Sequence, residues 1–216
     1  MNFFDLHVHT KFSEGESSVE EVASMAKKLG YKGVCLVYYP NRFNERNEIE
    51  NELKEVGKKY GIKLLLGFKA RKPKELRKLV ERRKEFDLLL VRGGNLNLNR
   101  IAVETPEVDI LTHPEINRLD SGINHVMAKL AKKNNVAIEL NFREVLITSK
   151  TTRSRVLRNL RTNAMICKKY GVPIVITSGA ISHWEMKDPY VLCSFGVLLG
   201  LEKKEAKNAV SKVPEL

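Results

Sequence analysis

Three histidines lie at positions where they could share a site. His7 and His9 close the first apolar run of the chain, FFDLHVHT, and His113 closes a later one, VDILTH. Alternate residues of a β-strand share a face, so Asp5, His7 and His9 are expected to point the same way. Neutral imidazoles are suitable ligands for zinc, manganese or iron. Two interpretations stay open at this point: a metal site, or histidines that only pack and hydrogen-bond.

The elements that would position these side chains are seven short runs rich in Val, Ile and Leu. Helical patterns separate most of the runs, with only a short stretch between LLLV and VDILTH, which is typical of repeated βα units with a parallel sheet buried on both faces. The runs are FFDLHV, GVCLV, IKLLLGF, LLLV, VDILTH, VAIELN and PIVITS.

Such a sheet can stay open and doubly wound, or it can close into a barrel. The GxGxxG turn that a dinucleotide-binding open sheet would show after an early strand is absent from the sequence. We therefore expect an α/β fold of the distorted or incomplete TIM-like (βα) barrel type, with about seven parallel strands, as a single domain over residues 1–216. Both the open sheet and the barrel place ligands at the carboxyl ends of the strands.

Polar and basic side chains follow directly after these runs. In chain order they are His7 and His9, Tyr38 and Tyr39, Lys69 and Arg71, Arg92, His113, Asn141 and Arg143, and Ser178 with His183. Four of the five histidines are thus expected at one rim of the barrel.

The charge of the chain is concentrated in two places. The net charge is +12, with 38 Lys and Arg against 26 Asp and Glu. The segment 71–84 has eight basic and two acidic residues, and the segment 145–184 has seven basic residues and no Asp or Glu. The rest of the chain is close to neutral.

The second segment predicts an amphipathic helix over 155–170. Its apolar side chains fall on one stripe, and Arg155, Arg158, Arg161, Lys168 and Lys169 fall opposite. A solvated helix face usually alternates charge signs to gain ion pairs, and this one has no acid. An unneutralised basic face favours a polyanion as partner, with Arg suited to phosphate.

The strand ends also resemble a known superfamily. DLHVHT is similar to the first motif of the polymerase and histidinol phosphatase (PHP) superfamily of metal-dependent phosphoesterases, and LTHPE and IELN resemble later motifs. The resemblance implies a distorted (βα)₇ barrel. The departures remove carboxylates: Tyr38 and Tyr39 replace an Asp-His pair, Lys69 replaces a bridging Glu, and Gly179 and Ile181 replace an Asp-x-His motif. These changes would prevent the site from holding several divalent cations, because they remove carboxylate ligands and add a positive charge.

The sequence lacks these metal ligands and carries two basic segments. In this combination it resembles the protein component 3 family of archaeal and eukaryotic ribonuclease P. The resemblance implies an RNA-binding subunit that supports removal of the 5′ leader from precursor tRNA, while the RNA subunit performs hydrolysis with its own Mg²⁺. It implies component 2 and other protein subunits as partners, and no catalytic residue or bound metal in this chain. An apolar patch for component 2 is expected around Phe142 or 145–147. The residues expected to contact RNA are Lys69, Arg71, Lys72, Lys74, Arg77, Arg92, Arg143, Arg153, Arg155, Arg158 and Arg161.

Two alternatives remain open from sequence. One is a metal-dependent phosphoesterase acting through His7, His9 and His113, with Asp5 orienting an imidazole from behind. The other is a generic (βα) scaffold whose basic faces are exposed to solvent and have no binding role.

Composition also bounds the location of the chain. No apolar stretch approaches the roughly 20 residues of a membrane span, and the start has no signal-peptide pattern, so a cytoplasmic protein is expected. Cys35, Cys167 and Cys193 lie in apolar sequence and are expected to be buried thiols.

Overall fold

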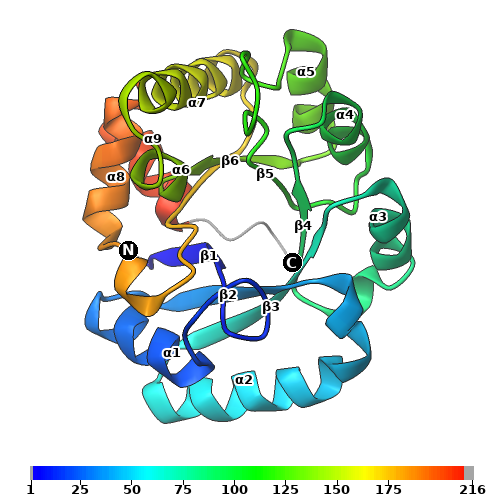
Figure 1. The fold of residues 1–216 in the computed structure, drawn as a ribbon, viewed down its shortest axis with the longest axis vertical. Coiled ribbons are helices and arrows are strands. Elements are labelled where there is room, and N and C mark those ends of the chain that lie inside the picture. Colours follow the sequence, from blue (N-terminus) through cyan, green and yellow to red (C-terminus); the bar gives the residue numbers. More distant parts are fainter. Residues whose placement is uncertain (1, 212–216) are drawn as a thin grey trace.

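Seven strands alternate with helices in this structure, a computed structural model that describes residues 2–211 (Figure 1). The strands are β1 (Phe4–Val8), β2 (Gly33–Tyr38), β3 (Lys63–Ala70), β4 (Leu88–Arg92), β5 (Ile110–Thr112), β6 (Ala137–Asn141) and β7 (Ile174–Thr177). The helices are α1 (Val19–Lys28), α2 (Arg46–Tyr60), α3 (Pro73–Val80), α4 (Leu96–Glu104), α5 (His125–Lys133), α6 (Arg143–Leu146), α7 (Lys150–Tyr170), α8 (Pro189–Leu198) and α9 (Lys203–Ser211), with short 3-10 turns at Pro40–Glu45, Arg83–Glu85 and His183–Glu185.

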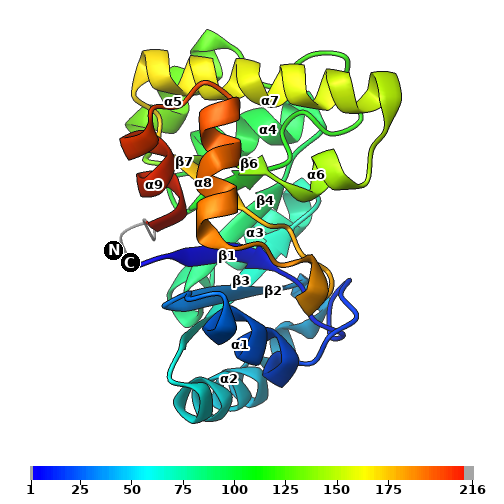
Figure 2. The same ribbon diagram turned by 90° about the vertical axis from the view of Figure 1, so that its left-hand side faces the viewer.

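The strands form one parallel sheet in the order β1 to β7, which confirms the predicted barrel class. Loop and side-chain hydrogen bonds join its two edges: the His9 amide donates to the Ala180 carbonyl over 2.8 Å, and the Ser178 amide donates to Asp5 Oδ1 over 3.2 Å. The helices surround the sheet (Figure 1). Figure 2 shows β1 from the side, running toward the end of the barrel where α6 lies, so the carboxyl ends of the strands open at that end.

Apolar side chains fill two layers. One cluster lies inside the barrel, where the strands contribute alternate residues such as Cys35, Leu65, Leu90 and Val175. A larger cluster packs the outer faces of the strands against the helices. Because both strand faces are buried, the runs read as continuously apolar in sequence. The three cysteines are free and buried, as predicted.

Local signals set most element ends. The Ser18 hydroxyl accepts from the Glu21 amide and the Glu21 carboxylate accepts from the Ser18 amide, forming a capping box at the start of α1. Helix α7 ends at Tyr170 and is capped by Gly171, whose φ of +67° suits glycine. Two expectations were incomplete: α4 was not recognised, although Asn95 caps it, and α7 begins at Lys150 rather than Arg155.

An irregularity in β1 changes the expected side-chain directions. The β1–β2 register shifts between Asp5 and Val8. Leu6 accordingly packs in the interior cluster, while His7 and His9 both turn toward the interior above it. The strict alternation predicted for Asp5, His7 and His9 was therefore wrong at Asp5, because a bulge breaks the period of two.

No helix within residues 2–211 combines the length and apolar character needed to cross a bilayer.

Candidate functional site

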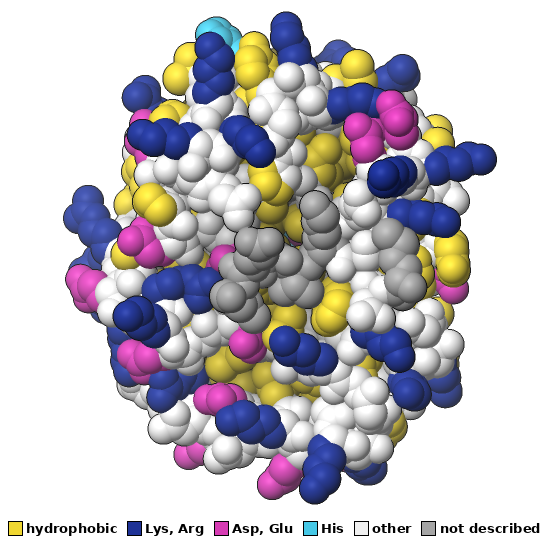
Figure 3. All heavy atoms as spheres, turned by 180° about the vertical axis from the view of Figure 1, so that it is seen from behind, with side chains coloured by type: hydrophobic (Ala, Val, Ile, Leu, Met, Phe, Trp, Pro, Cys, Tyr) yellow, Lys and Arg dark blue, Asp and Glu magenta, His cyan; other side chains and the backbone are white. Residues whose placement is uncertain are grey.

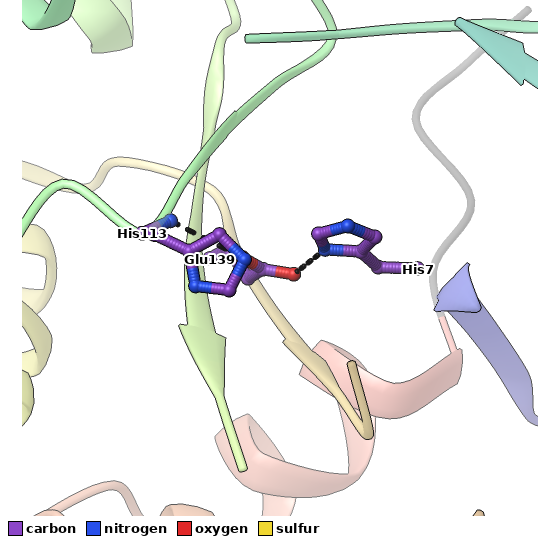
Figure 4. A group of neighbouring side chains, drawn as sticks. All are labelled: His7, His113 and Glu139. Atoms are coloured by element: carbon purple, nitrogen blue, oxygen red, sulfur yellow. Dashed lines mark hydrogen bonds and ion pairs between the residues drawn. The ribbon is translucent and has the colours of Figure 1, made fainter. Parts of the chain in front are cut away.

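A buried polar network lies at the carboxyl ends of the strands. Figure 4 shows His7 from β1, His113 from the end of β5 and Glu139 from β6 turned toward one another. Each of these three side chains is at most 8% exposed. They offer one ligand atom each within a 4.8 Å span, so the geometry brings together two of the three predicted histidines and an acid.

Glu139 is the centre of this network. Its Oε1 atom accepts from His7 Nδ1 at 2.6 Å, from the Thr177 hydroxyl at 2.6 Å and from Asn141 Nδ2 at 3.1 Å. Its Oε2 atom accepts from the His113 amide at 3.2 Å. Burial by itself would raise the pKa of Glu139, but the interactions with His7 and His113 hold it well below its usual range. The residue is therefore a buried carboxylate fixed by four donors.

Lys69 reaches into the same network from β3. Its Nζ atom lies 2.8 Å from His9 Nε2, 3.0 Å from His7 Nε2 and 3.0 Å from Glu14 Oε1, and the side chain is 0% exposed. Burial lowers the pKa of Lys69 to about 8, which still leaves an ammonium at neutral pH. Glu14, in the loop after β1, has a pKa well below its usual range: burial alone would raise it, but the charge of Lys69 and the hydrogen bond that Lys69 donates outweigh that effect.

Two imidazoles of this network, those of His7 and His9, are neutral. Burial lowers the pKa of His7 to about 4 and that of His9 to about 3, because the protein interior disfavours the imidazolium. His113 differs: burial alone would lower its pKa, but Glu139 and Glu144 raise it. Its Nδ1 atom lies 3.2 Å from Glu144 Oε1.

Protonation of His7 and His9 is expected to lower the free energy of unfolding as pH drops below about 6.5. In the unfolded chain His7 and His9 take up protons near pH 6.5, whereas in the folded protein they do so near 4 and 3, so the unfolded chain binds more protons in between. The raised pKa of His113 opposes this effect, and so do Asp5 and Glu115, because burial raises their pKa values to about 7 and about 8 and they take up protons first in the folded protein. We expect His9 to contribute a loss of about 2 kcal/mol between pH 7 and pH 5, measured by urea unfolding of the wild type and a His9→Asn variant.

Two histidine variants sharpen this measurement. Relative to the wild type, His9→Asn should gain about 2 kcal/mol of stability on going from pH 7 to pH 5, whereas replacing the exposed His125 in the same way should give no such gain. The same change between the two pH values in His9→Asn and in the wild type would show that the His9 imidazole does not titrate as described.

The network does not fit the divalent cations that the phosphoesterase resemblance implies. His7 uses Nδ1 for Glu139 and Nε2 for Lys69, so neither ring nitrogen is left for a metal. A divalent cation about 4 Å from an ammonium is repelled by roughly 8 kcal/mol at an effective dielectric constant of about 20. Gly179, with φ of +63°, packs so closely on the Asn141 side chain that any larger residue would collide with it.

The alternative role given to Asp5 is also wrong. Its Oδ1 atom accepts from the Ser178 amide and, at 3.4 Å, from the His7 amide, and it orients no imidazole. Glu139 performs that task for His7. The signal for Glu139 was an acid in the middle of the otherwise apolar run VAIELN, and sequence reasoning passed over it. Glu14, in the loop FSEGES, gave no comparable signal.

The other predicted RNA-contacting residues lie on the surface or at the rim. Around α3, Arg71, Lys72, Lys74 and Arg77 are exposed, and the Arg71 guanidinium stacks 4.1 Å from the centre of the Tyr39 ring. On α7, Arg153, Arg158 and Arg161 are exposed and Arg155 is half-buried. Arg92 and Arg143 are half-buried at the rim, 3.9 Å from Glu14 and 3.1 Å from Glu185 respectively.

Helix α7 is the least neutralised of these surfaces. Within the part of the chain that the structure describes, none of its four arginines makes an ion pair with an acid; Arg153 and Arg158 donate only to the backbone carbonyls of Thr148 and Leu119. Its apolar stripe packs inward, as predicted. Helices α3 and α7 lie on different sides of the barrel (Figure 1). On the face seen from behind, acidic side chains are interspersed among the Lys and Arg (Figure 3).

The apolar patch expected for a protein partner is only partly present. Phe142 packs against Phe195, with ring centroids 5.0 Å apart, whereas Leu146 and Ile147 are exposed. Further exposed apolar side chains lie on α8: Tyr190, Val191, Val197 and Leu198.

Comparison with known proteins assigns the chain. A family model described as RNase P subunit p30 matches residues 2–216. The chain belongs to this family. Ribonuclease P protein component 3 of Methanosarcina barkeri is 36% identical over 214 residues, covering 99% of this chain and 87% of that protein. Component 3 of Methanocaldococcus jannaschii is 38% identical, covering 82% and 76%.

Solved structures agree with the p30 assignment. A chain in a cryo-EM structure of archaeal ribonuclease P with mature tRNA matches with a TM-score of 0.80 and 35% identity, covering 94% of this chain and 86% of that one. A histidinol phosphate phosphatase from Lactococcus lactis, solved with zinc, L-histidinol and phosphate, matches with a TM-score of 0.64 at 13% identity, covering 93% and 95%. The second likeness shows that the p30 chain shares the barrel fold of that phosphatase.

Proposed function

We propose that this chain is an RNA-binding protein subunit of ribonuclease P that supports removal of the 5′ leader from precursor tRNA by the catalytic RNA. The observation that carries the proposal is the row of arginines on α7, which is exposed at three of four positions and unpaired with acids among residues 2–211. Such a row repels itself unless a polyanion neutralises it. The match of residues 2–216 to the p30 family supports the ribonuclease P RNA as that polyanion.

The proposed RNA contacts are phosphate contacts. They are made by Arg71, Lys72, Lys74 and Arg77 around α3 and by Arg153, Arg155, Arg158 and Arg161 on α7, with Arg92 and Arg143 at the rim. Lys69 is omitted, because its ammonium is buried and donates to three groups of the protein itself. Phosphate contacts position a protein on RNA without reading its sequence, so binding should depend strongly on salt.

The protein alone is proposed to be non-catalytic. A phosphoesterase of this fold needs cations at the strand ends, and there Lys69 occupies the histidine nitrogens. In the holoenzyme the RNA would supply the chemistry with its bound Mg²⁺. The matched relatives are numbered components of one enzyme, which supports component 2 and other protein subunits as further partners. A cytoplasmic location is part of this proposal.

Reconstitution tests the proposed function. Adding the protein with component 2 to ribonuclease P RNA should increase cleavage of the precursor tRNA leader at low Mg²⁺, because bound arginines lower the repulsion between the two RNAs that Mg²⁺ otherwise screens. The measurement is the cleavage rate across a Mg²⁺ series, with and without this chain.

Two arms of that experiment separate the alternatives. The protein alone with Mn²⁺ or Zn²⁺ should leave precursor tRNA and a generic phosphate ester intact; turnover lost on His7→Ala would instead support the phosphoesterase alternative. A holoenzyme whose Mg²⁺ requirement is the same with and without this chain would contradict the proposal.

A further inference from the structure

Three electron-rich atoms converge on one cation inside the barrel. His7 Nε2, His9 Nε2 and Glu14 Oε1 lie 3.0, 2.8 and 3.0 Å from Lys69 Nζ. The lysine and both histidines are at most 2% exposed. The cation therefore sits in the protein interior and not in a solvated ion pair.

The hydrogen-bond partners assign the protons on the two imidazoles. His7 Nδ1 faces the Glu139 carboxylate at 2.6 Å and must carry a hydrogen. His9 Nδ1 lies 3.0 Å from Ser13 Oγ, whose own hydroxyl is directed to the Thr10 carbonyl, so we assign a hydrogen to this nitrogen as well. Both Nε2 atoms then present lone pairs. An ammonium has three donors, and the three acceptors use all of them.

The spacing of the acceptors is that of a metal coordination shell. The two Nε2 atoms are 3.1 Å apart, and His9 Nε2 lies 2.9 Å from Glu14 Oε1. Acceptors at these separations repel one another unless a cation lies between them. Zinc bound at about 2.0–2.1 Å from each ligand sets neighbouring ligands roughly 3 Å apart. The donor set of two imidazoles and one carboxylate also suits zinc.

We propose that the Lys69 ammonium is a built-in cation that takes the place of a divalent metal, and that removing it opens a metal site formed by His7, His9 and Glu14. The ligand spacing already matches, so zinc would only have to lie nearer the plane of the three atoms than Nζ does. Glu139 would orient the His7 ring as a ligand, as it orients it now. The lysine thus keeps the strand ends assembled without metal and closes them to metal at the same time.

Zinc binding by the purified, tag-free protein tests this proposal. In titration calorimetry at neutral pH, Lys69→Ala should bind one Zn²⁺ roughly a hundredfold more tightly than the wild type, because the repelling charge has gone. Lys69→Ala combined with His9→Ala should lose that gain. Co²⁺ should give the absorption of a four-coordinate site with Lys69→Ala only.

Control variants keep the test decisive. Lys69→Met removes the charge but fills the space, and should bind Zn²⁺ more weakly than Lys69→Ala. If Lys69→Ala is unfolded without metal, Zn²⁺ should restore its melting transition, and a failure to do so counts against the proposal. Equal Zn²⁺ affinity in wild type and Lys69→Ala, or unchanged affinity when His9 is also removed, would overturn it.

Discussion

Reversing two charges on α7, with Arg158→Glu and Arg161→Glu together, is expected to weaken binding to ribonuclease P RNA by about tenfold or more. Both side chains are exposed on the face that has no acidic partner among residues 2–211. Each lost phosphate contact should also reduce the slope of log affinity against log salt by about 0.7–0.9. The measurement is RNA affinity across a salt series for both proteins.

A matched pair on another helix supplies the control. Lys54→Glu and Lys58→Glu lie on α2, where Lys54 already pairs with Glu50 at 2.6 Å and acids alternate with bases. This double variant changes the net charge by the same amount and should alter the affinity and the salt slope much less. Equal losses from both double variants would show that only net charge matters, and the α7 face would then not be the RNA-binding surface.

Replacing Glu139 by Ala is expected to lower the free energy of unfolding by about 3–5 kcal/mol. The carboxylate is 0% exposed and accepts from four donors. Its removal leaves these donors without their acceptor and leaves the imidazoles and Lys69 beside a cavity that no longer holds a negative charge. Urea unfolding near pH 7 measures the effect. Glu139→Gln should cost less, because one amide oxygen still accepts, although the amide nitrogen faces donors.

An exposed acid provides the comparison. Glu81→Ala, at the end of α3, should change the free energy of unfolding by no more than about 0.5 kcal/mol. A loss below about 1 kcal/mol for Glu139→Ala would mean that the buried network does not hold the strand ends together.

The two predictions concern different parts of one molecule. The buried network joins β1, β3, β5, β6 and β7 at the carboxyl ends of the strands. In this chain the cation at the strand ends is the ammonium of Lys69, a residue of β3. The excess positive charge lies outside, on α3, α7 and the rim, which supports the proposed binding of RNA on the surface of the barrel.

The sequence by itself determined the elements and the location of the charge. Runs of Val, Ile and Leu predicted the seven strands, because strands buried on both faces carry apolar side chains at every position. Charge counts alone isolated the segments 71–84 and 145–184, because net charge is a sum over residues and needs no coordinates. Helix α4 was not predicted, because its sequence, LNLNRIAVE, gave no clear helical pattern, although Asn95 caps it.

Only the tertiary structure decided what the polar residues at the strand ends do. Lys69 was expected to reach RNA, but its strand position points it inward, where it meets His7 and His9 from a strand some sixty residues earlier. The bulge in β1 turned both histidines toward it and moved Asp5 to the edge with β7. Neither the inward direction nor the bulge is encoded by residue type. Both follow from the register and closure of the barrel, which bring distant residues within hydrogen-bonding range and remove them from solvent.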